Sequence, residues 1–371
     1  MNPLSQPVPT QEEARDRFLE RLLQATSGAM DIFTIYLGDR LGLYNAMADG
    51  QPVTSMELAQ RTGTQERYIR EWLEQQTVTG ILQVENPEAA STERRFSLPP
   101  AHIEVLTDTE SGNYLAPLAR MMLGCARPMG MLLDAFRNGG GVPFTAYGPD
   151  LREGQAAINR PAFLYELGQS WLPAIPDIHT RLQETPPARI ADIGCGGGWS
   201  CIGMAKAYPQ VRVDGYDVDA PSVELAQQNV LSYHLSDRVH IFAEDAAHSA
   251  ERSPGAYDLV TAFECVHDMS DPVGVLRAMR QMAKPDGAVI IMDERVGDRF
   301  TPEGNDVEWF MYGFSVLHCL PVGMADEPSV GTGTVMRTET LRQYACAAGF
   351  REVEVLPIEN FFFRFYRLHG I

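Results

Sequence analysis

Apolar residues near the start of the chain recur at helical spacing, beginning with Phe18, Leu19, Leu22 and Leu23. Two shorter helices follow at 54–63 and 64–79. Glu57 stands three residues after Thr54 as in a capping box, Gly63 ends the first helix, and Thr64 caps the second. Strands at 80–84 and 96–98 then enclose a polar hairpin tip. Helix, turn, helix and a two-stranded wing predict a mostly helical winged-helix domain over residues 11–108.

The pattern changes from Ala188 onward, where short apolar runs alternate with helical segments. The expected strands are 189–193, 211–216, 239–242, 257–262, 288–292, 353–356 and 361–368, with helices between them. Such alternation predicts an α/β fold, a Rossmann-like seven-stranded sheet with helices on both faces, over residues 188–371. Residues 109–187, broken by Gly139-Gly140-Gly141 and ending at Thr185-Pro186-Pro187, predict a helical connector over the mouth of the site.

Composition narrows the function classes. The 371 residues include 30 Lys and Arg against 49 Asp and Glu, a formal net charge of −19, which disfavours nucleic acid and anionic membranes as partners. In the predicted helix 64–79, the negative charges of Glu66, Glu71 and Glu74 outnumber the positive charges of Arg67 and Arg70. This charge balance disfavours binding in a DNA groove.

The same composition bears on location. No apolar run reaches the about 18 residues of a membrane span, and residues 1–10 predict a disordered tail without the basic and apolar regions of a signal peptide. The six cysteines include no C-x-x-C pair and indicate free thiols, so a cytoplasmic protein is expected.

A glycine loop carries the main chemical signal. The run Asp192-Ile193-Gly194-Cys195-Gly196-Gly197-Gly198 directly follows a predicted strand and precedes a helix. Glycines there let the backbone approach a ligand closely. When Gly194 is counted as the first position, the sixth is Trp199, so the dinucleotide pattern G-x-G-x-x-G fails. The acid two residues before the first glycine suits a ligand with a positive amine rather than a pyrophosphate.

This loop resembles motif I of class I S-adenosylmethionine-dependent methyltransferases. The resemblance implies S-adenosyl-L-methionine as cofactor and S-adenosyl-L-homocysteine as product. It also implies that Asp217 accepts from the ribose hydroxyls and that Asp245 and Ala246 face the adenine. The cofactor-binding residues expected in this way are Asp192, Gly194, Gly196, Gly198, Asp217, Val218, Asp245, Ala246 and Glu264.

Downstream, the segment His267-Asp268-Met269-Ser270-Asp271 resembles the H-D-W-S-D segment of small-molecule O-methyltransferases that carry an N-terminal winged-helix dimerisation domain, and it is also similar to bacterial winged-helix methyltransferases of unassigned substrate. The resemblance implies His267 as general base, an acid at Asp293 or Glu294 that holds it, and a homodimer formed through the N-terminal helices. Met336 stands near the position where the family has a second acid, so that part of the pattern is missing.

The residues that would bind the molecule receiving the methyl group are less clearly indicated by the sequence. The long insertion 295–337 carries aromatic residues at helical spacing, which either line an apolar pocket or pack against the connector. The predicted pocket residues are Tyr147, Tyr165, Trp309, Tyr312 and His318. Asp268, Asp271, Asp293 and Glu294 have no compelling metal-ligand spacing, so we expect solvated acids and no metal.

The resulting hypothesis is methyl transfer from S-adenosylmethionine to a small, aromatic or polyketide-like natural-product acceptor, most simply at oxygen. Transfer to nitrogen, sulfur or carbon is equally compatible with the residues. Two other hypotheses stay open: a winged-helix transcription regulator that senses S-adenosylmethionine, and a methyltransferase fold with non-methylation chemistry.

Overall fold

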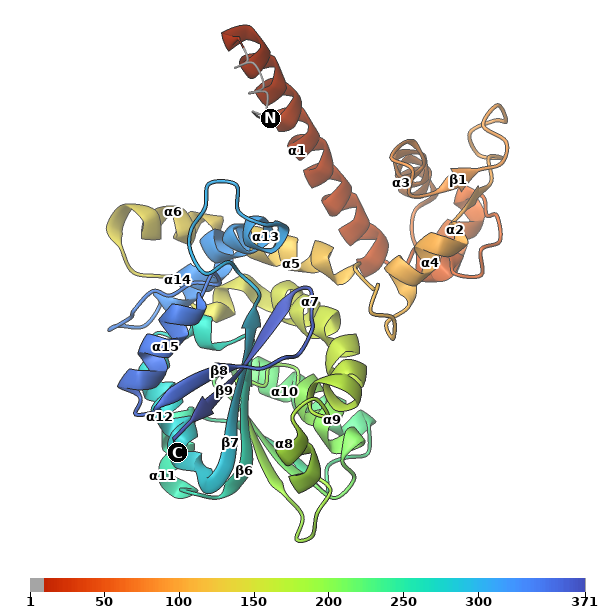
Figure 1. Ribbon diagram of the computed structural model, residues 1–371. Coiled ribbons are helices and arrows are strands. Elements are labelled where there is room, and N and C mark those ends of the chain that lie inside the picture. The colour runs from red at the N-terminus through yellow and green to blue at the C-terminus, as the bar shows by residue number, and fades with distance from the viewer. Residues whose placement is uncertain (1–9, 371) are drawn as a thin grey trace, which may run out of the picture. The chain divides into compact units, whose positions relative to one another are not determined.

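The computed structural model describes residues 10–370, in two compact units of which the first ends at Arg120 and the second begins at Met121 (Figure 1). The predicted tail lies outside the described residues except for Thr10. The side chain of Thr10 accepts from the backbone N–H of Glu13 and caps α1 (Gln11–Arg40). The predicted connector, residues 109–187, is divided between the two units.

The first unit has the predicted winged-helix order. Its elements after α1 are η1 (Asn45–Met47), α2 (Ser55–Thr62), α3 (Glu66–Val78), β1 (Gln83–Val84), β2 (Phe96–Ser97) and α4 (Pro100–Thr107). Thr54 and Glu57 form the predicted capping box of α2, and Gly63 ends this helix in a left-handed conformation. The predicted cap of α3 is wrong by one residue, because Gln65 occupies that position in place of Thr64.

One seven-stranded sheet forms the centre of the second unit. Its strands are β3 (Arg189–Ile193), β4 (Arg212–Asp217), β5 (Val239–Ala243), β6 (Tyr257–Phe263), β7 (Ala283–Glu294), β8 (Glu352–Val355) and β9 (Phe363–His369). They lie in the order β5-β4-β3-β6-β7-β9-β8, with the first five parallel and β9 antiparallel to both of its neighbours. The order reverses between β3 and β6, and ligands of parallel sheets bind beside such a reversal.

Helices cover both faces of this sheet, as predicted. After α5 (Pro117–Ala126), which spans the boundary of the two units, the helices of the second unit are α6 (Met129–Asn138), η2 (Phe144–Tyr147), α7 (Gly148–Pro161), the π-helical η3 (Ala162–Trp171), α8 (Pro176–Arg181), α9 (Trp199–Ala207), α10 (Ala220–Ser232), α11 (Ala246–Arg252), η4 (Val266–Asp268), α12 (Pro272–Met282), α13 (Asp306–Phe314), η5 (Ser315–Cys319), α14 (Leu320–Gly323) and α15 (Thr338–Ala347). Not all of them lie on the sheet, since α6, η2 and α13 form a separate apolar cluster.

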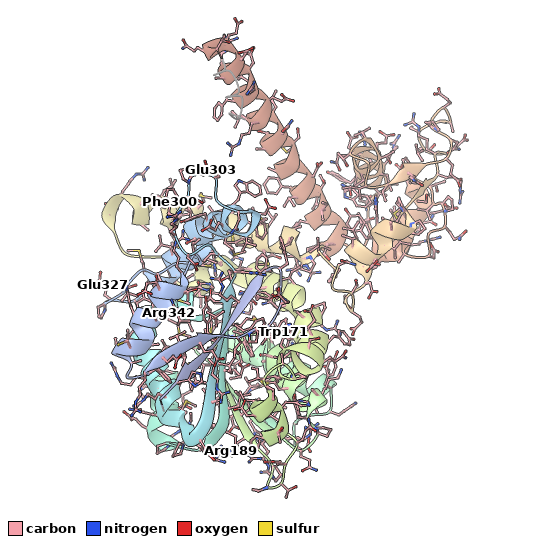
Figure 2. The ribbon with its side chains drawn as sticks, viewed as in Figure 1. Trp171, Arg189, Phe300, Glu303, Glu327 and Arg342 are labelled. Carbon is pink, nitrogen blue, oxygen red and sulfur yellow. The ribbon has the colours of Figure 1, made fainter. Side chains whose placement is uncertain are left out.

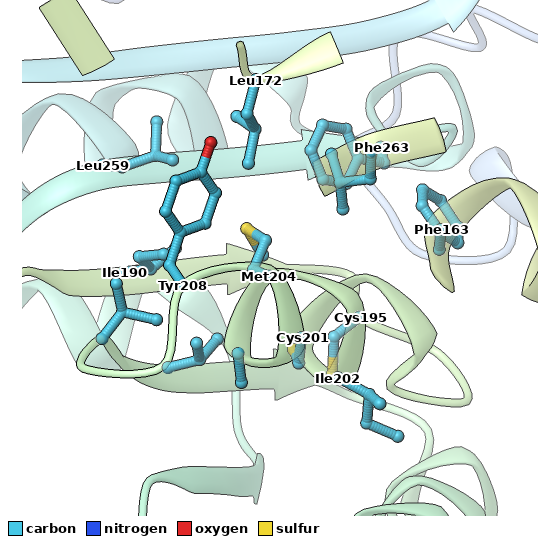
Figure 3. Packing of buried hydrophobic residues seen from close by; sticks show 14 of the residues in the cluster. Phe163, Leu172, Ile190, Cys195, Cys201, Ile202, Met204, Tyr208, Leu259 and Phe263 are labelled. Carbon is cyan, nitrogen blue, oxygen red and sulfur yellow. The ribbon is translucent and has the colours of Figure 1, made fainter. Parts of the chain in front are cut away.

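Two cores result from this arrangement. On one face, η3, α9 and α10 pack on the sheet, and Phe163, Ile190 and Met204 lie among their buried side chains (Figure 3). On the other face, α11, α12 and α15 contribute Ala250, Leu276 and Leu341. Within residues 10–370, no helix combines the length and apolarity that a membrane crossing needs.

Candidate functional site

The glycine loop joins the end of β3 to the start of α9. Gly194, Gly196 and Gly198 have φ values of +67°, +50° and +76°, which side chains other than glycine rarely adopt. A Cβ on Gly197 would also lie 2.8 Å from the Cβ of Ala156 on α7. The loop therefore needs its glycines both for its turn and for the close approach of α7.

Asp192 fixes the base of this loop. Its carboxylate is buried and accepts from the hydroxyls of Thr261, at 2.6 Å, and Ser200. Burial raises the pKa of Asp192 in spite of these hydrogen bonds. Asp192 therefore has a structural role besides the predicted interaction with a ligand amine, because its hydrogen bonds connect β3 to β6 and to α9.

Asp217 stands at the carboxyl end of β4, opposite the loop. Its Oδ2 accepts from the backbone N–H of Gly196 at 2.8 Å, and its Oδ1 accepts from that of Asp219 at 2.9 Å. Two ionised oxygens offer about four acceptor positions, so capacity remains for the hydroxyls of a ligand. The sequence predicted this residue for that task, and the structure brings it beside the loop.

Asp245 and Ala246 follow β5 and begin α11. The carboxylate of Asp245 caps this helix by accepting from the backbone N–H of Ala247 at 2.7 Å. The ring of Tyr216, which also lines the cavity, stacks on that of Phe242 with centroids 5.4 Å apart. This end of the site combines an acid, a helix start and apolar rings.

Glu264 follows β6 in a left-handed conformation, with φ +53°, which is rare for a residue with a side chain. Its Oε2 accepts from the side-chain amide of Asn159 on α7 at 2.8 Å. Burial raises the pKa of Glu264 to about 8. Strained residues cluster at functional sites, which favours a role for this carboxyl.

These elements enclose a cavity of about 510 Å³ at the carboxyl ends of β3, β4 and β6. Eight of the nine predicted cofactor residues line it, and Gly198 does not. Gly198 instead permits helix packing, because a Cβ there would lie 2.9 Å from the Cβ of Ala226 on α10. Apolar side chains complete the wall, namely Phe144, Phe163, Phe263, Met269 and Val322.

His267 does not line the cavity, whereas its neighbour Asp268 does. The His267 ring is buried, with Nδ1 2.9 Å from Oδ1 of Asp293 and Nε2 3.2 Å from Oδ1 of Asp268. Burial alone would lower the pKa of His267, but the carboxylates of Asp293, Glu294 and Asp268 raise it well above the ordinary value. Because the ring lies behind the cavity wall, it does not reach a ligand in the cavity, so this geometry opposes the predicted role as general base.

The acid predicted to hold His267 is present as Asp293. Its side chain and that of Glu294 are buried at the end of β7, so the expectation that they are solvated is wrong for both. Two acids near one imidazole form a compact buried cluster.

The five predicted acceptor residues do not line the cavity. Trp309 is 72% exposed on α13, because this helix turns Val307, Met311 and Phe314 inward instead. Tyr312 and Tyr165 are also exposed, by 40% and 36%. Tyr147 and His318 are buried against each other, with ring centroids 4.6 Å apart.

Other groups at the site escaped sequence analysis. Arg152 on α7 pairs with Asp219 at 2.7 Å, and both line the cavity with Asn159. The two groups that sequence analysis missed, Arg152 and Asn159, come from α7, whose sequence gives a helix signal but no ligand motif. The loops before α13 and after α14, labelled at Phe300, Glu303 and Glu327 in Figure 2, belong to the long insertion, of which Ala325 and Asp326 line the cavity.

Two family models match the chain. The family described as "Methyltransferase domain" matches residues 169–355, and "Rv2258c-like winged HTH domain" matches residues 29–108.

Among curated relatives, a ubiquinone biosynthesis O-methyltransferase of Burkholderia pseudomallei is 34% identical over 120 residues, which are 32% of this chain and 47% of that protein. The enzyme of the same name from Burkholderia thailandensis is 34% identical over 186 residues, 49% of this chain and 71% of that protein. The polyketide synthase ThaQ of Burkholderia thailandensis is 33% identical over 106 residues, 29% of this chain and 5% of that protein. The match with this chain thus covers 5% of the length of the polyketide synthase and about half of the length of the Burkholderia pseudomallei enzyme.

Solved structures share the fold over nearly the whole chain. The mitomycin 7-O-methyltransferase MmcR superposes with a TM-score of 0.70 at 22% identity, covering 96% of this chain and 99% of that one. Human N-acetylserotonin methyltransferase, solved with S-adenosylmethionine, gives 0.69 at 20% identity, covering 98% and 100%.

Proposed function

This chain belongs to the methyltransferase domain family, whose methyl donor is S-adenosylmethionine, and we propose that it transfers that methyl group to an oxygen of a small, aromatic or polyketide-like acceptor. The observation that carries the proposal is the cavity at the carboxyl ends of β3, β4 and β6. The glycine loop, Asp217, Asp245 and Glu264 all line it.

The chain's own residues suit each part of the donor. The backbone of the loop at Gly194 and Gly196 can approach the amino-acid end, and Asp217 has acceptor capacity left for the ribose hydroxyls. We assign Asp245 and Ala246, which also line the cavity, to the adenine. The donor's sulfonium supplies the activated methyl group, so the protein mainly has to align the two reactants and exclude water.

The acceptor compartment is the remaining part of the cavity. Its apolar wall at Phe144, Phe163 and Met269 favours a flat, apolar molecule. The names of the relatives, ubiquinone biosynthesis O-methyltransferase and mitomycin 7-O-methyltransferase, support transfer to oxygen.

His267 has a different place in this proposal from the one predicted. It lies behind Asp268 and pairs with it, so it fixes Asp268 at the cavity wall and acts as a positioning residue. Burial alone would raise the pKa of Asp268, but the pairing with His267 lowers it. Asp268 is therefore a weak proton acceptor, and the acceptor hydroxyl needs another means of activation.

A regulator that reads DNA is not supported by α3. Arg67 pairs with Glu71 at 2.6 Å, and Arg70 pairs with Glu66 at 3.2 Å. Arginines that form ion pairs with glutamates leave little net positive charge on the helix for binding DNA phosphates.

We further propose a homodimer built on α1. In this helix Phe18, Leu19, Leu22 and Leu23 are each more than half exposed, and Gly38 is the buried residue. An exposed apolar face of this kind marks an interface, and the occupant that we infer is α1 of a second copy.

Calorimetry tests the donor site directly. We expect heat on titration with S-adenosylmethionine and with S-adenosylhomocysteine, and at least a 10-fold weaker affinity for Asp217→Ala. Asp237→Ala, at an exposed loop acid, is the matched control and should bind as the parent does. Methyl transfer is then measured as release of S-adenosylhomocysteine with a panel of phenols. Absence of heat with both nucleosides from folded protein would disprove the donor site, and donor binding without transfer to any phenol would disprove the acceptor class.

A further inference from the structure

One face of α7 makes its contacts with the cavity in a regular order. Arg152, Ala156 and Asn159 all line the cavity and stand four and then three residues apart, so they share one side of the helix. Each of the two polar residues meets an acid that follows a strand. Arg152 pairs with Asp219 beyond β4 at 2.7 Å, and Asn159 donates its side-chain amide to Glu264 beyond β6 at 2.8 Å.

The middle of α7 lies against the glycine loop that follows β3. A Cβ on Gly197 would lie only 2.8 Å from that of Ala156. Because β4, β3 and β6 are successive neighbours in the sheet, the three contacts place α7 across three adjacent strand ends. A donor held by the glycine loop and by Asp217 would therefore be enclosed between the strand ends and this helix.

Both ends of α7 are suited to bending. At its start, Gly148 has a φ of +75°, a conformation that favours glycine. At its end, Pro161 stands inside the helix and the chain continues as the π-helical η3. Prolines and π-helical turns are the usual places where helices bend. In η3, Phe163 and Trp171 belong to the core on one face of the sheet, whereas three of the 14 residues of α7 are buried. α7 can thus move while η3 stays in place.

The contact between Asn159 and Glu264 is sensitive to charge. A hydrogen bond to an ionised carboxylate is roughly twice as strong as one to a neutral acceptor. The carboxyl of Glu264 stands beside the glycine loop, since β6 is the neighbour of β3, and the positive sulfonium of S-adenosylmethionine favours its ionised form. The thioether of S-adenosylhomocysteine is neutral and has no such effect. The bond from Asn159 should therefore be stronger with the methylated nucleoside bound.

Other groups also act on Glu264. His267, Asp268 and Asp293 influence its ionisation electrostatically. These three residues are fixed neighbours, whereas the sulfonium charge is lost when the methyl group leaves. A difference between the two nucleosides at this carboxyl is therefore a difference made by the sulfonium.

We propose that α7 is a lid that closes more tightly over S-adenosylmethionine than over S-adenosylhomocysteine. Arg152 holds the lid to Asp219 with either nucleoside, and Asn159 adds a bond whose strength depends on the sulfonium. Once the methyl group has left, Glu264 takes up a proton from solvent, this bond weakens and the lid loosens for the product to leave. A ligand shifts a conformational equilibrium only through such a differential contact. The inference rests on the proposed function, because it needs the donor in this cavity.

Hydrogen exchange of the full chain tests the lid. The backbone amides of α7 are measured without nucleoside, with saturating S-adenosylmethionine and with saturating S-adenosylhomocysteine, and α15 serves as the reference. We expect both nucleosides to slow exchange in α7 and the methylated one to slow it about fivefold more, because exchange reports the free energy of local opening. Exchange in α15 should be the same with either nucleoside.

Two variants separate the contacts of the lid. Asn159→Leu removes the amide at similar size and should abolish the difference between the nucleosides. Arg152→Met should keep that difference but speed the dissociation of both nucleosides at least about 10-fold, since it removes a hydrogen bond between charged groups. Rapid mixing with tryptophan fluorescence measures dissociation, because Trp199 lines the cavity. Arg137→Met, at an exposed arginine of α6, is the matched control and should release both nucleosides as the parent does.

The parent chain decides even where a variant does not fold, since its exchange needs no substitution. Binding of both nucleosides with equal exchange in α7, or with exchange as fast as in the free chain, overturns the lid and leaves the donor site intact. A difference that persists in Asn159→Leu overturns the charge-dependent contact. Failure of both nucleosides to bind would disprove the proposed donor site and the lid with it.

Discussion

Asn159 on α7 donates its side-chain amide to Oε2 of Glu264 at 2.8 Å and so connects two segments 105 residues apart. The bond holds a carboxyl of raised pKa, about 8, in the wall of the donor cavity. His267, Asp268 and Asp293 act on the same carboxyl electrostatically. Glu264 is therefore mostly neutral at pH 6 and mostly ionised above pH 8.

This carboxyl should make donor binding pH-dependent. A sulfonium favours the ionised form, so below a pKa of about 8 its binding must expel a proton from Glu264. The affinity ratio of S-adenosylmethionine to S-adenosylhomocysteine should rise between pH 6 and pH 8, by at most about 10-fold per pH unit, and level off above. Calorimetry at several pH values measures the ratio. Glu264→Gln should make it flat, and a flat ratio in the parent protein would contradict the expectation.

Gly198 offers a test of the loop's packing. An alanine there would combine a φ of +76° with a Cβ 2.9 Å from that of Ala226, so unfolding free energy should fall by about 1–3 kcal/mol. Gly313→Ala on α13 is the control, because nothing lies within 4 Å of its Cβ and alanine favours helix. Urea unfolding of both variants measures the difference. Equal stability of Gly198→Ala and the parent would show that the loop does not need this glycine.

The α1 interface should respond to charge. Replacing both Leu19 and Leu23 with Asp places two carboxylates on the exposed apolar face, where desolvation opposes association. Light scattering coupled to size exclusion should then show a monomer in place of a dimer. Met56→Asp, at a half-exposed apolar residue of α2, should leave the dimer intact. A parent chain that is monomeric at micromolar concentration would refute the interface.

Local features of the chain predicted most of the donor site. Gly194 and Gly196 were recognisable because glycine adopts a positive φ more readily than any other residue. Asp217 was recognisable because a parallel strand ends there. The face of α13 was not recognisable in this way. Its apolar stripe includes both Trp309, which is exposed, and Met311, which is buried, and only packing against the rest of the unit separates them.

Long-range pairs lay beyond sequence analysis for the same reason. Arg152 and Asp219, 67 residues apart, become partners through the packing of α7 on the loop. Cys319 meets His267 only once η5 folds back beside η4. Neither pair has a spacing that a linear pattern could record.

The positioning role of His267 can be separated from a role in donor binding. His267→Gln keeps a side chain of similar length but removes the charge that pairs with Asp268. We expect turnover to fall about 10²-fold, since displacement of a wall residue misaligns the reactants, while the affinity for S-adenosylhomocysteine stays within about twofold. A urea titration must accompany the assay, because the buried carboxylates of Asp293 and Glu294 then lose their partner and such losses destabilise by about 3–5 kcal/mol. His248→Gln, an exposed histidine on α11, is the matched control and should keep parent turnover. Parent-level turnover in folded His267→Gln would remove His267 from the reaction, and loss of homocysteine-nucleoside binding would assign it to the donor site instead.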